Sequence, residues 1–218
     1  MNFSARAAAQ MKLLGGWLCL DFVNTAGGRQ AQAGRKEITY RASSDKLKDY
    51  GDLLAWSLHT EILNDPQAQS LWRESQQRPD DAASVLRRAV ALREAIYRLA
   101  LAILNQTAPY ASDLAALNRE LTLAREFRQL VATADGFDWQ WATAKKALDR
   151  MLWAIANSAA QLLTAGELSR LKQCGGENCS WLFADISKNR SRQWCDMQDC
   201  GNLAKVRRFR SRPGNKSE

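Results

Sequence analysis

Four cysteines near the end of the chain have the spacing of a metal site. Cys174, Cys179, Cys195 and Cys200 fall within 27 residues in the pattern C-x4-C-x15-C-x4-C. Two close cysteine pairs in a chain expected to be cytoplasmic indicate metal ligands rather than disulfides. Zinc binds soft thiolates in closed tetrahedral shells, so the pattern predicts one structural zinc ion. An iron–sulfur cluster and a reactive dithiol switch are the alternatives that remain open.

The segment around these cysteines is strongly basic. Residues 171–218 carry 10 basic and 5 acidic side chains, which accounts for most of the net charge of +8. Concentrated positive charge favours a polyanionic partner, because each neutralised phosphate releases counterions. A solvated basic tail that only aids solubility is the alternative. The candidate nucleic-acid contacts are Lys188, Arg190, Arg192, Lys205, Arg207, Arg208, Arg210 and Arg212.

The residues between the cysteines predict a hairpin followed by a basic helix. Gly175-Gly176 permits a tight turn and lets backbone N–H groups point at the thiolates. Residues 181–183 predict a short strand, and residues 202–210 predict a helix. On that helix, Val206 and Phe209 are three apart and are expected to face the metal core.

Two further residues of this segment have a structural and a functional interpretation. Asp185 is expected to cap a turn or to pair with Arg192. Trp194, next to a predicted ligand, is expected to cover the metal, and stacking on a base is the alternative.

The N-terminal part of the chain offers one candidate ligand site. The alternating apolar residues of 18–23 predict a short, half-buried strand, and Cys19 within it is expected to be a buried apolar residue. Asp21, Asn24 and Thr25 lie at the end of this strand, before a glycine-bearing loop. Polar groups in such a place favour a small-molecule site. Alternatively, they only end the strand and cap a turn.

The middle of the chain predicts helices and one hairpin. An Asp-Gly turn at 135–136 between two aromatic-rich segments predicts a hairpin over 126–132 and 137–141. The polar stretch 64–79 contains two prolines and predicts a connection or a short broken helix. Trp72, Trp139, Trp141 and Trp153 are expected to pack in the core and the hairpin, or to line a pocket. Apolar periodicity predicts helices over 45–63 (capped by Ser44-Asp45), 81–105, 112–123 and 142–165 (ending at Gly166).

The residues also carry a family resemblance. CGGENC, FADIS and SRQWCDMQDCGN within Cys174–Arg210 resemble the CGNR-type zinc finger, and WLCLDFVNT is similar to the opening of the ABATE domain that precedes it. The resemblance spans about Leu14 to Arg212 and implies a stress-related transcription regulator with zinc on the four cysteines and DNA as its partner. The sequence departs from the family motif at Leu203, which stands where the motif has an arginine; Arg207 or Arg208 could substitute for it.

The predicted protein is therefore mainly α with short β-hairpins. We expect an ABATE-like sensing or dimerising domain at 1–168, a zinc finger at 169–212 and a disordered tail at 213–218. The predicted function is DNA-binding transcription regulation; a zinc-stapled protein-interaction module and, third, a small-molecule-binding enzyme are the alternatives. A homodimer reading two half-sites is expected.

Enzymatic and membrane classes fit the sequence poorly. His59 is the single histidine and has no recognisable partner, and no phosphate loop, nucleophile elbow or HExxH motif is present. No apolar run approaches the roughly 20 residues that span a bilayer, and Met1–Met11 lacks the apolar core of a secretory signal. We expect a cytoplasmic protein that is not an enzyme.

Overall fold

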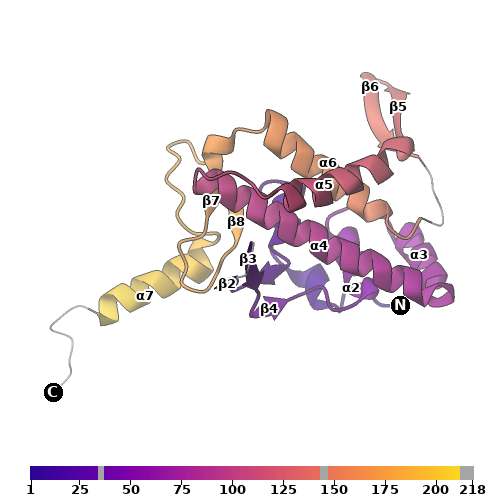
Figure 1. The fold of residues 1–218 in the computed structure, drawn as a ribbon. Helices are drawn as coiled ribbons and strands as arrows, with labels where there is room; N and C mark the ends of the chain where they lie inside the picture. The colour runs from indigo at the N-terminus through magenta and orange to yellow at the C-terminus, as the bar shows by residue number, and fades with distance from the viewer. Residues whose placement is uncertain (34–36, 143–146, 212–218) are drawn as a thin grey trace.

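The structure, a computed structural model, describes residues 1–33, 37–142 and 147–211. In these ranges the protein is mainly helical with short antiparallel hairpins, as the sequence predicts (Figure 1). The helices are α1 Leu18–Val23, α2 Tyr50–His59, α3 Asp65–Gln77, α4 Pro79–Leu104, α5 Ala111–Ala124, α6 Arg150–Ala165 and α7 Asn202–Arg210. The strands are β1 Ala26–Gly27, β2 Gln30–Ala33, β3 Ile38–Arg41, β4 Ser44–Asp45, β5 Arg128–Thr133, β6 Gly136–Trp141, β7 Leu171–Gln173 and β8 Leu182–Ala184.

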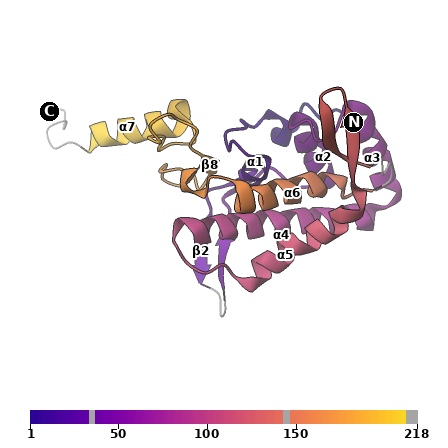
Figure 2. The ribbon, with the colours of Figure 1, turned by 90° about the horizontal axis from the view of Figure 1, so that it is seen from above.

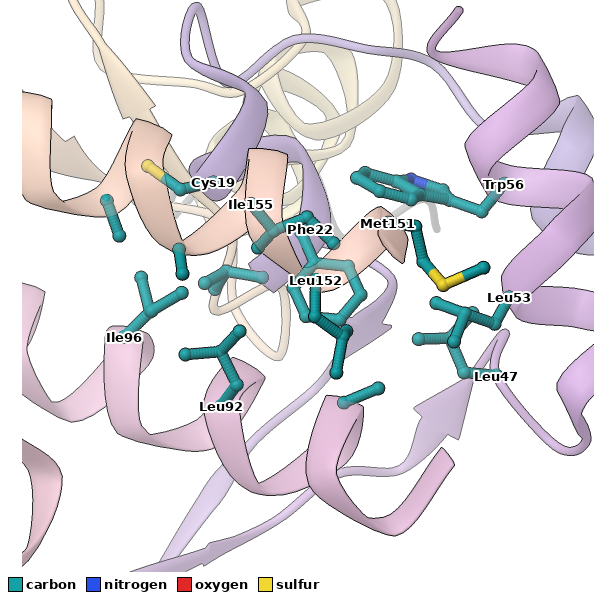
Figure 3. Packing of buried hydrophobic residues seen from close by; sticks show 14 of the residues in the cluster. Cys19, Phe22, Leu47, Leu53, Trp56, Leu92, Ile96, Met151, Leu152 and Ile155 are labelled. Atoms are coloured by element: carbon teal, nitrogen blue, oxygen red, sulfur yellow. The ribbon is translucent and has the colours of Figure 1, made fainter. Parts of the chain in front are cut away.

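The main core lies where α1, α2, α4 and α6 meet. Figure 3 shows Phe22 of α1, Trp56 of α2, Leu92 of α4 and Met151 of α6 converging there, and each is at most 1% exposed. The long helix α4 supplies the surface on which the others pack. Its residues at 85, 89, 92, 96 and 99 are all buried, so the predicted apolar stripe is confirmed.

Residues 18–23 form helix α1, so the predicted strand is wrong. Five of its six residues, Cys19 to Val23, are buried. A short apolar run that is buried on all sides has no exposed face, and its periodicity cannot distinguish a strand from a helix. The apparent alternation carried no information here.

The connection expected at 64–79 is the 13-residue helix α3. Asn64 and Gln67 form a reciprocal capping box, each side chain accepting a hydrogen bond from the other's backbone N–H. Pro66 lies in the first turn, where a missing N–H costs nothing. The prolines therefore mark the starts of α3 and α4.

Two predicted helices begin later than expected. Asp49, not Ser44-Asp45, caps α2, in a second capping box with Asp52, and Asp45 instead belongs to β4. Helix α6 begins at Arg150 instead of 142, and the predicted residues 143–146 lie outside the described ranges. The predicted end at Gly166 is confirmed.

The hairpin around the Asp-Gly turn is confirmed as β5–β6. Its register pairs Arg128 with Trp141 and Thr133 with Gly136. Strand β2 lies in the glycine-bearing stretch that the sequence suggested was a loop, and it pairs with β3, just beyond that stretch, in a second hairpin.

The cysteine-bearing segment joins the helical part through the β7–β8 hairpin. Leu171 of β7 and Leu182 of β8 belong to the main core, and β8 contacts α1. Helix α7, in contrast, extends away from the rest of the molecule (Figures 1 and 2). Across the described ranges, no helix is both long enough and apolar enough to cross a membrane.

Candidate zinc centre and nucleic-acid interface

The structure brings the four predicted ligands together. The Sγ atoms of Cys174, Cys179, Cys195 and Cys200 all lie within 4.8 Å of one another. The Sγ of Cys195 lies 3.5 Å from that of Cys179 and 3.6 Å from that of Cys200. A Zn–S bond of about 2.3 Å gives a tetrahedron with edges of roughly 3.8 Å, so the cluster fits one four-coordinate ion.

The first cysteine pair needs its glycines and its unusual backbone. A Cβ on Gly176 would lie 2.9 Å from the Sγ of Cys200, so no larger residue fits there. The Gly176 N–H points at the Sγ of Cys174 (3.4 Å), as the sequence predicts. Asn178 and Ser180 adopt left-handed backbone conformations on either side of Cys179, and these two reversals turn its side chain toward the other cysteines.

A small core encloses the sulfurs. Fully buried Phe183 packs with Cys174 and Cys195, and Trp194 packs against the same cluster. The ring of Trp194 would lie 3.1 Å from a Cβ placed on Gly175. The predicted covering role of Trp194 is consistent with this position.

Asp185 is a buried hydrogen-bonding centre for the loop between the cysteine pairs. Its carboxylate accepts bonds from Lys172 Nζ (2.6 Å) and from the backbone N–H groups of Ser187 (3.0 Å) and Arg192 (2.9 Å). Burial alone would raise the pKa of Asp185, but these donors outweigh it and hold the pKa below its usual range. The contact to Arg192 is through its backbone, so the predicted side-chain pair is wrong.

The three residues predicted for a small-molecule site lie at the junction with β8 and inside the core. Asn24 acts like a strand neighbour: its Nδ2 donates to Leu182 O (2.8 Å), and its Oδ1 accepts from Leu182 N–H (2.9 Å). Thr25 donates to Phe22 O and accepts from Arg93, and Asp21 accepts from Gly15 N–H. All three are at most 8% exposed, and these contacts are structural.

Further contacts hold the first cysteine pair on the helical part. Gly28 N–H donates to Cys179 O (3.0 Å), and Arg29 N–H donates to Ser180 Oγ (3.0 Å). Gly28 has φ +62°, and a Cβ there would lie 2.0 Å from Ser43 Oγ, so the approach requires glycine.

Seven of the eight predicted nucleic-acid contacts lie in the described ranges and divide into bonded and unbonded side chains. Arg192 is used internally: it donates to the backbone oxygens of Leu14, Trp194 and Cys195, and its guanidinium lies 4.1 Å from the Phe183 ring centroid. Arg190 pairs with Glu167, and Arg207 pairs with Glu177. Within the ranges that the structure describes, Lys188, Lys205, Arg208 and Arg210 have neither an ion-pair partner nor a side-chain hydrogen bond, and Arg212 lies outside those ranges.

Helix α7 has the predicted bounds but not the predicted orientation. Val206 and Phe209 do not face the metal core: they are 46% and 60% exposed, and Leu203 is 58% exposed. None of the residues of α7 is buried. Phe183, Trp181 and Trp194 pack against the cysteines in their place.

The sequence did not reveal which basic residues pair with the three aspartates of the cysteine-bearing segment. Lys12, near the start of the chain, pairs with both Asp196 and Asp199 between the second cysteines. Lys172 pairs with Asp185. The only signal was indirect: isolated acids in a basic segment imply cationic partners, but sequence distance conceals which ones.

Comparison with known families agrees with this geometry. Residues 16–166 match the model of the ABATE family, described as a putative stress-induced transcription regulator, and residues 170–213 match the CGNR zinc finger. No curated protein matches the chain. The cysteine cluster together with the zinc-finger match identifies the cofactor as one structural zinc ion. The matched families are of regulator and zinc-finger type.

Proposed function

Because the chain belongs to the ABATE family of putative stress-induced transcription regulators and carries a CGNR zinc finger, we propose that it binds DNA through helix α7. The division into a domain at 1–168 and a finger at 169–212 is part of this proposal. The N-terminal domain would sense a ligand or form a homodimer, and the finger would make the DNA contacts.

The observation that supports DNA binding is the separation of charges around the zinc. Every acid in residues 171–211 has a basic partner: Glu177 pairs with Arg207, and the three aspartates pair with lysines. Lys205, Arg208 and Arg210 project from α7 with no acidic side chain on the helix. A projecting helix with unpaired cations suits contact with phosphates or base edges in a groove.

The test is binding of the zinc-loaded protein to genomic DNA fragments at two salt concentrations, with sequencing of the bound fragments. We expect affinity to fall steeply with salt. The double variant Arg208→Gln with Arg210→Gln should bind at least 10-fold more weakly and reduce the slope of log K against log salt by about 1 to 2. Arg73→Gln, an exposed arginine of α3, is the matched control. Equal affinity of the double variant and the control would reject α7 as the contact.

The protein-interaction alternative has its own supporting observation. Leu203, Val206 and Phe209 form an exposed apolar stripe on α7, and exposed apolar stripes favour protein partners over phosphates. The variant Phe209→Ser distinguishes the two: DNA affinity should be retained if α7 contacts DNA through its basic side chains. Two results together would favour the protein-interaction alternative. The unmodified chain would not bind DNA at low salt, and a protein that co-purifies with it would be lost from Phe209→Ser.

A further inference from the structure

A pocket of about 470 Å³ lies between the β5–β6 hairpin and helices α5 and α6. Figure 1 shows the hairpin standing beside the ends of these helices, far from the zinc finger. The volume of the pocket falls in the range of small-molecule sites, roughly 300 to 1,000 Å³. The polar and aromatic residues that line it are Asn118, Arg125, Arg128, Trp139, Trp141 and Asn157.

One face of the hairpin forms the aromatic wall of the pocket. Trp139 and Trp141 are two apart on β6, so both indoles lie on the same face. Arg128 is the cross-strand partner of Trp141 and therefore shares that face. Its guanidinium lies 4.4 Å from the ring centroid of Trp139. The wall thus combines two flat rings with a cation that already lies over the face of one of them.

The inner part of this wall is fixed to the core. Trp141 lies 5.9 Å from Trp153 between ring centroids, and Trp153 is stacked on Phe127 at 4.0 Å and is 1% exposed. Ala142 N–H donates to Phe127 O (2.7 Å) and closes the base of the hairpin. Trp139, further along the hairpin, is 54% exposed. A ligand would therefore meet one anchored indole and cover one exposed indole.

The charges of the pocket select an anion. Arg125 and Arg128 line it, none of its lining residues is acidic, and neither arginine has a carboxylate partner in the part of the chain that the structure describes. Asn118 and Asn157 add amide groups that can donate hydrogen bonds. Guanidinium groups bind carboxylates through two parallel hydrogen bonds, and indoles stack on flat rings.

We propose that this pocket binds a planar aromatic carboxylate, with its ring against Trp139 and Trp141 and its carboxylate on Arg128 and Arg125. This gives the sensing role in the proposed function a location and a ligand class. Binding here does not depend on DNA contact, because the pocket shares no residue with α7.

The experiment is calorimetric titration of the full zinc-loaded chain, without DNA, with benzoate, indole-3-carboxylate and 2-naphthoate. The corresponding amides are the neutral controls. We expect at least one carboxylate to bind at least 10-fold more tightly than its amide. Arg128→Gln and Trp139→Leu should each weaken binding at least 10-fold, and Arg73→Gln should leave it unchanged. Both pocket substitutions are at partly or largely exposed side chains, and an unchanged melting temperature shows that they fold.

Two results would overturn the proposal. The first is that no carboxylate of the series binds more tightly than its amide. The second is binding that survives both pocket substitutions, which places the ligand elsewhere. Either result leaves the DNA titration standing, and failure of DNA binding leaves the pocket standing, so the two proposals fail separately.

Discussion

The zinc core and helix α7 are neighbours in the chain and opposites in their contacts. Around the zinc core, the side chains of Asp185 and Arg192 form hydrogen bonds within the protein itself. Helix α7 begins two residues after Cys200, and none of its residues is buried. Its Lys205, Arg208 and Arg210 have no ion-pair partners in the described ranges. Side chains that are already bonded internally have little capacity to bind anything else. In this finger, arginines of the same type therefore divide into those bonded within the protein and those left free for the DNA contact that we propose.

The largest effect is expected when a zinc ligand is removed from the zinc core. In Cys195→Ser the finger should lose its metal, because apparent zinc binding contributes about 10 to 16 kcal/mol to folding in comparable fingers. The disturbance should reach α1, since β8 shares the main core with it. Fully buried Cys19, whose pKa burial raises to about 12, should then react faster with iodoacetamide.

The measurement is zinc content together with peptide mass spectrometry of the labelled Cys19. Cys19→Ala in the same background identifies the signal. Retained zinc would contradict the ligand assignment. Unchanged Cys19 labelling would show that the finger unfolds independently of α1.

A smaller effect is expected from the junction. Asn24→Ala leaves the buried N–H and C=O of Leu182 without partners, and each such group costs about 1 to 3 kcal/mol. The free energy of unfolding should fall by about 2 to 4 kcal/mol in urea denaturation. Asn202→Ala is the matched control, because Asn202 makes one exposed bond to Gln198 O. Equal losses in the two variants would show that burial at Asn24 is not what matters.

The sequence predicted the parts of the molecule whose chemistry is local. The cysteine spacing fixed the metal site, the Asp-Gly turn fixed the β5–β6 hairpin, and the periodicity of residues 85–99 fixed the face of α4. Long-range partners were not predictable. Asn24 bonds a residue 158 positions away, and Lys12 bonds Asp196 across 184 positions. The failure at α1 has another cause, since a run that is buried on every side has no periodic signal.

The acid sensitivity of the zinc end offers a still finer test. The folded-state pKa of Asp185 lies below its ordinary value of about 3.9. Its contribution to stability is therefore fully present above about pH 4 and is lost as pH falls further. Asp185→Asn should be less stable than the unmodified chain at pH 6, and the gap in melting temperature should narrow as pH falls below about 4.

Melting temperatures of both proteins across this range measure the gap. Zinc content is measured at each pH, and the comparison uses only the pH values at which both proteins retain their zinc. A gap that stays constant with pH would show that the charge of Asp185 is not what stabilises the loop.

The smallest change in stability is expected for substitutions in α7. They give the most direct test of the difference between the zinc core and α7. Arg208→Gln with Arg210→Gln removes two charges that have no ion-pair partner in the described ranges, so the free energy of unfolding should stay within about 0.5 kcal/mol. Arg192→Gln removes one charge of the same type but leaves backbone oxygens of Leu14, Trp194 and Cys195 without their donor. It should cost about 2 to 4 kcal/mol. Urea denaturation compares the stabilities and a DNA titration compares the affinities. Equal losses of stability in the two variants would contradict the comparison. So would an Arg192→Gln variant that keeps its zinc and loses as much DNA affinity as the α7 variant does. Either result would show that the bonded and unbonded arginines do not have separate roles.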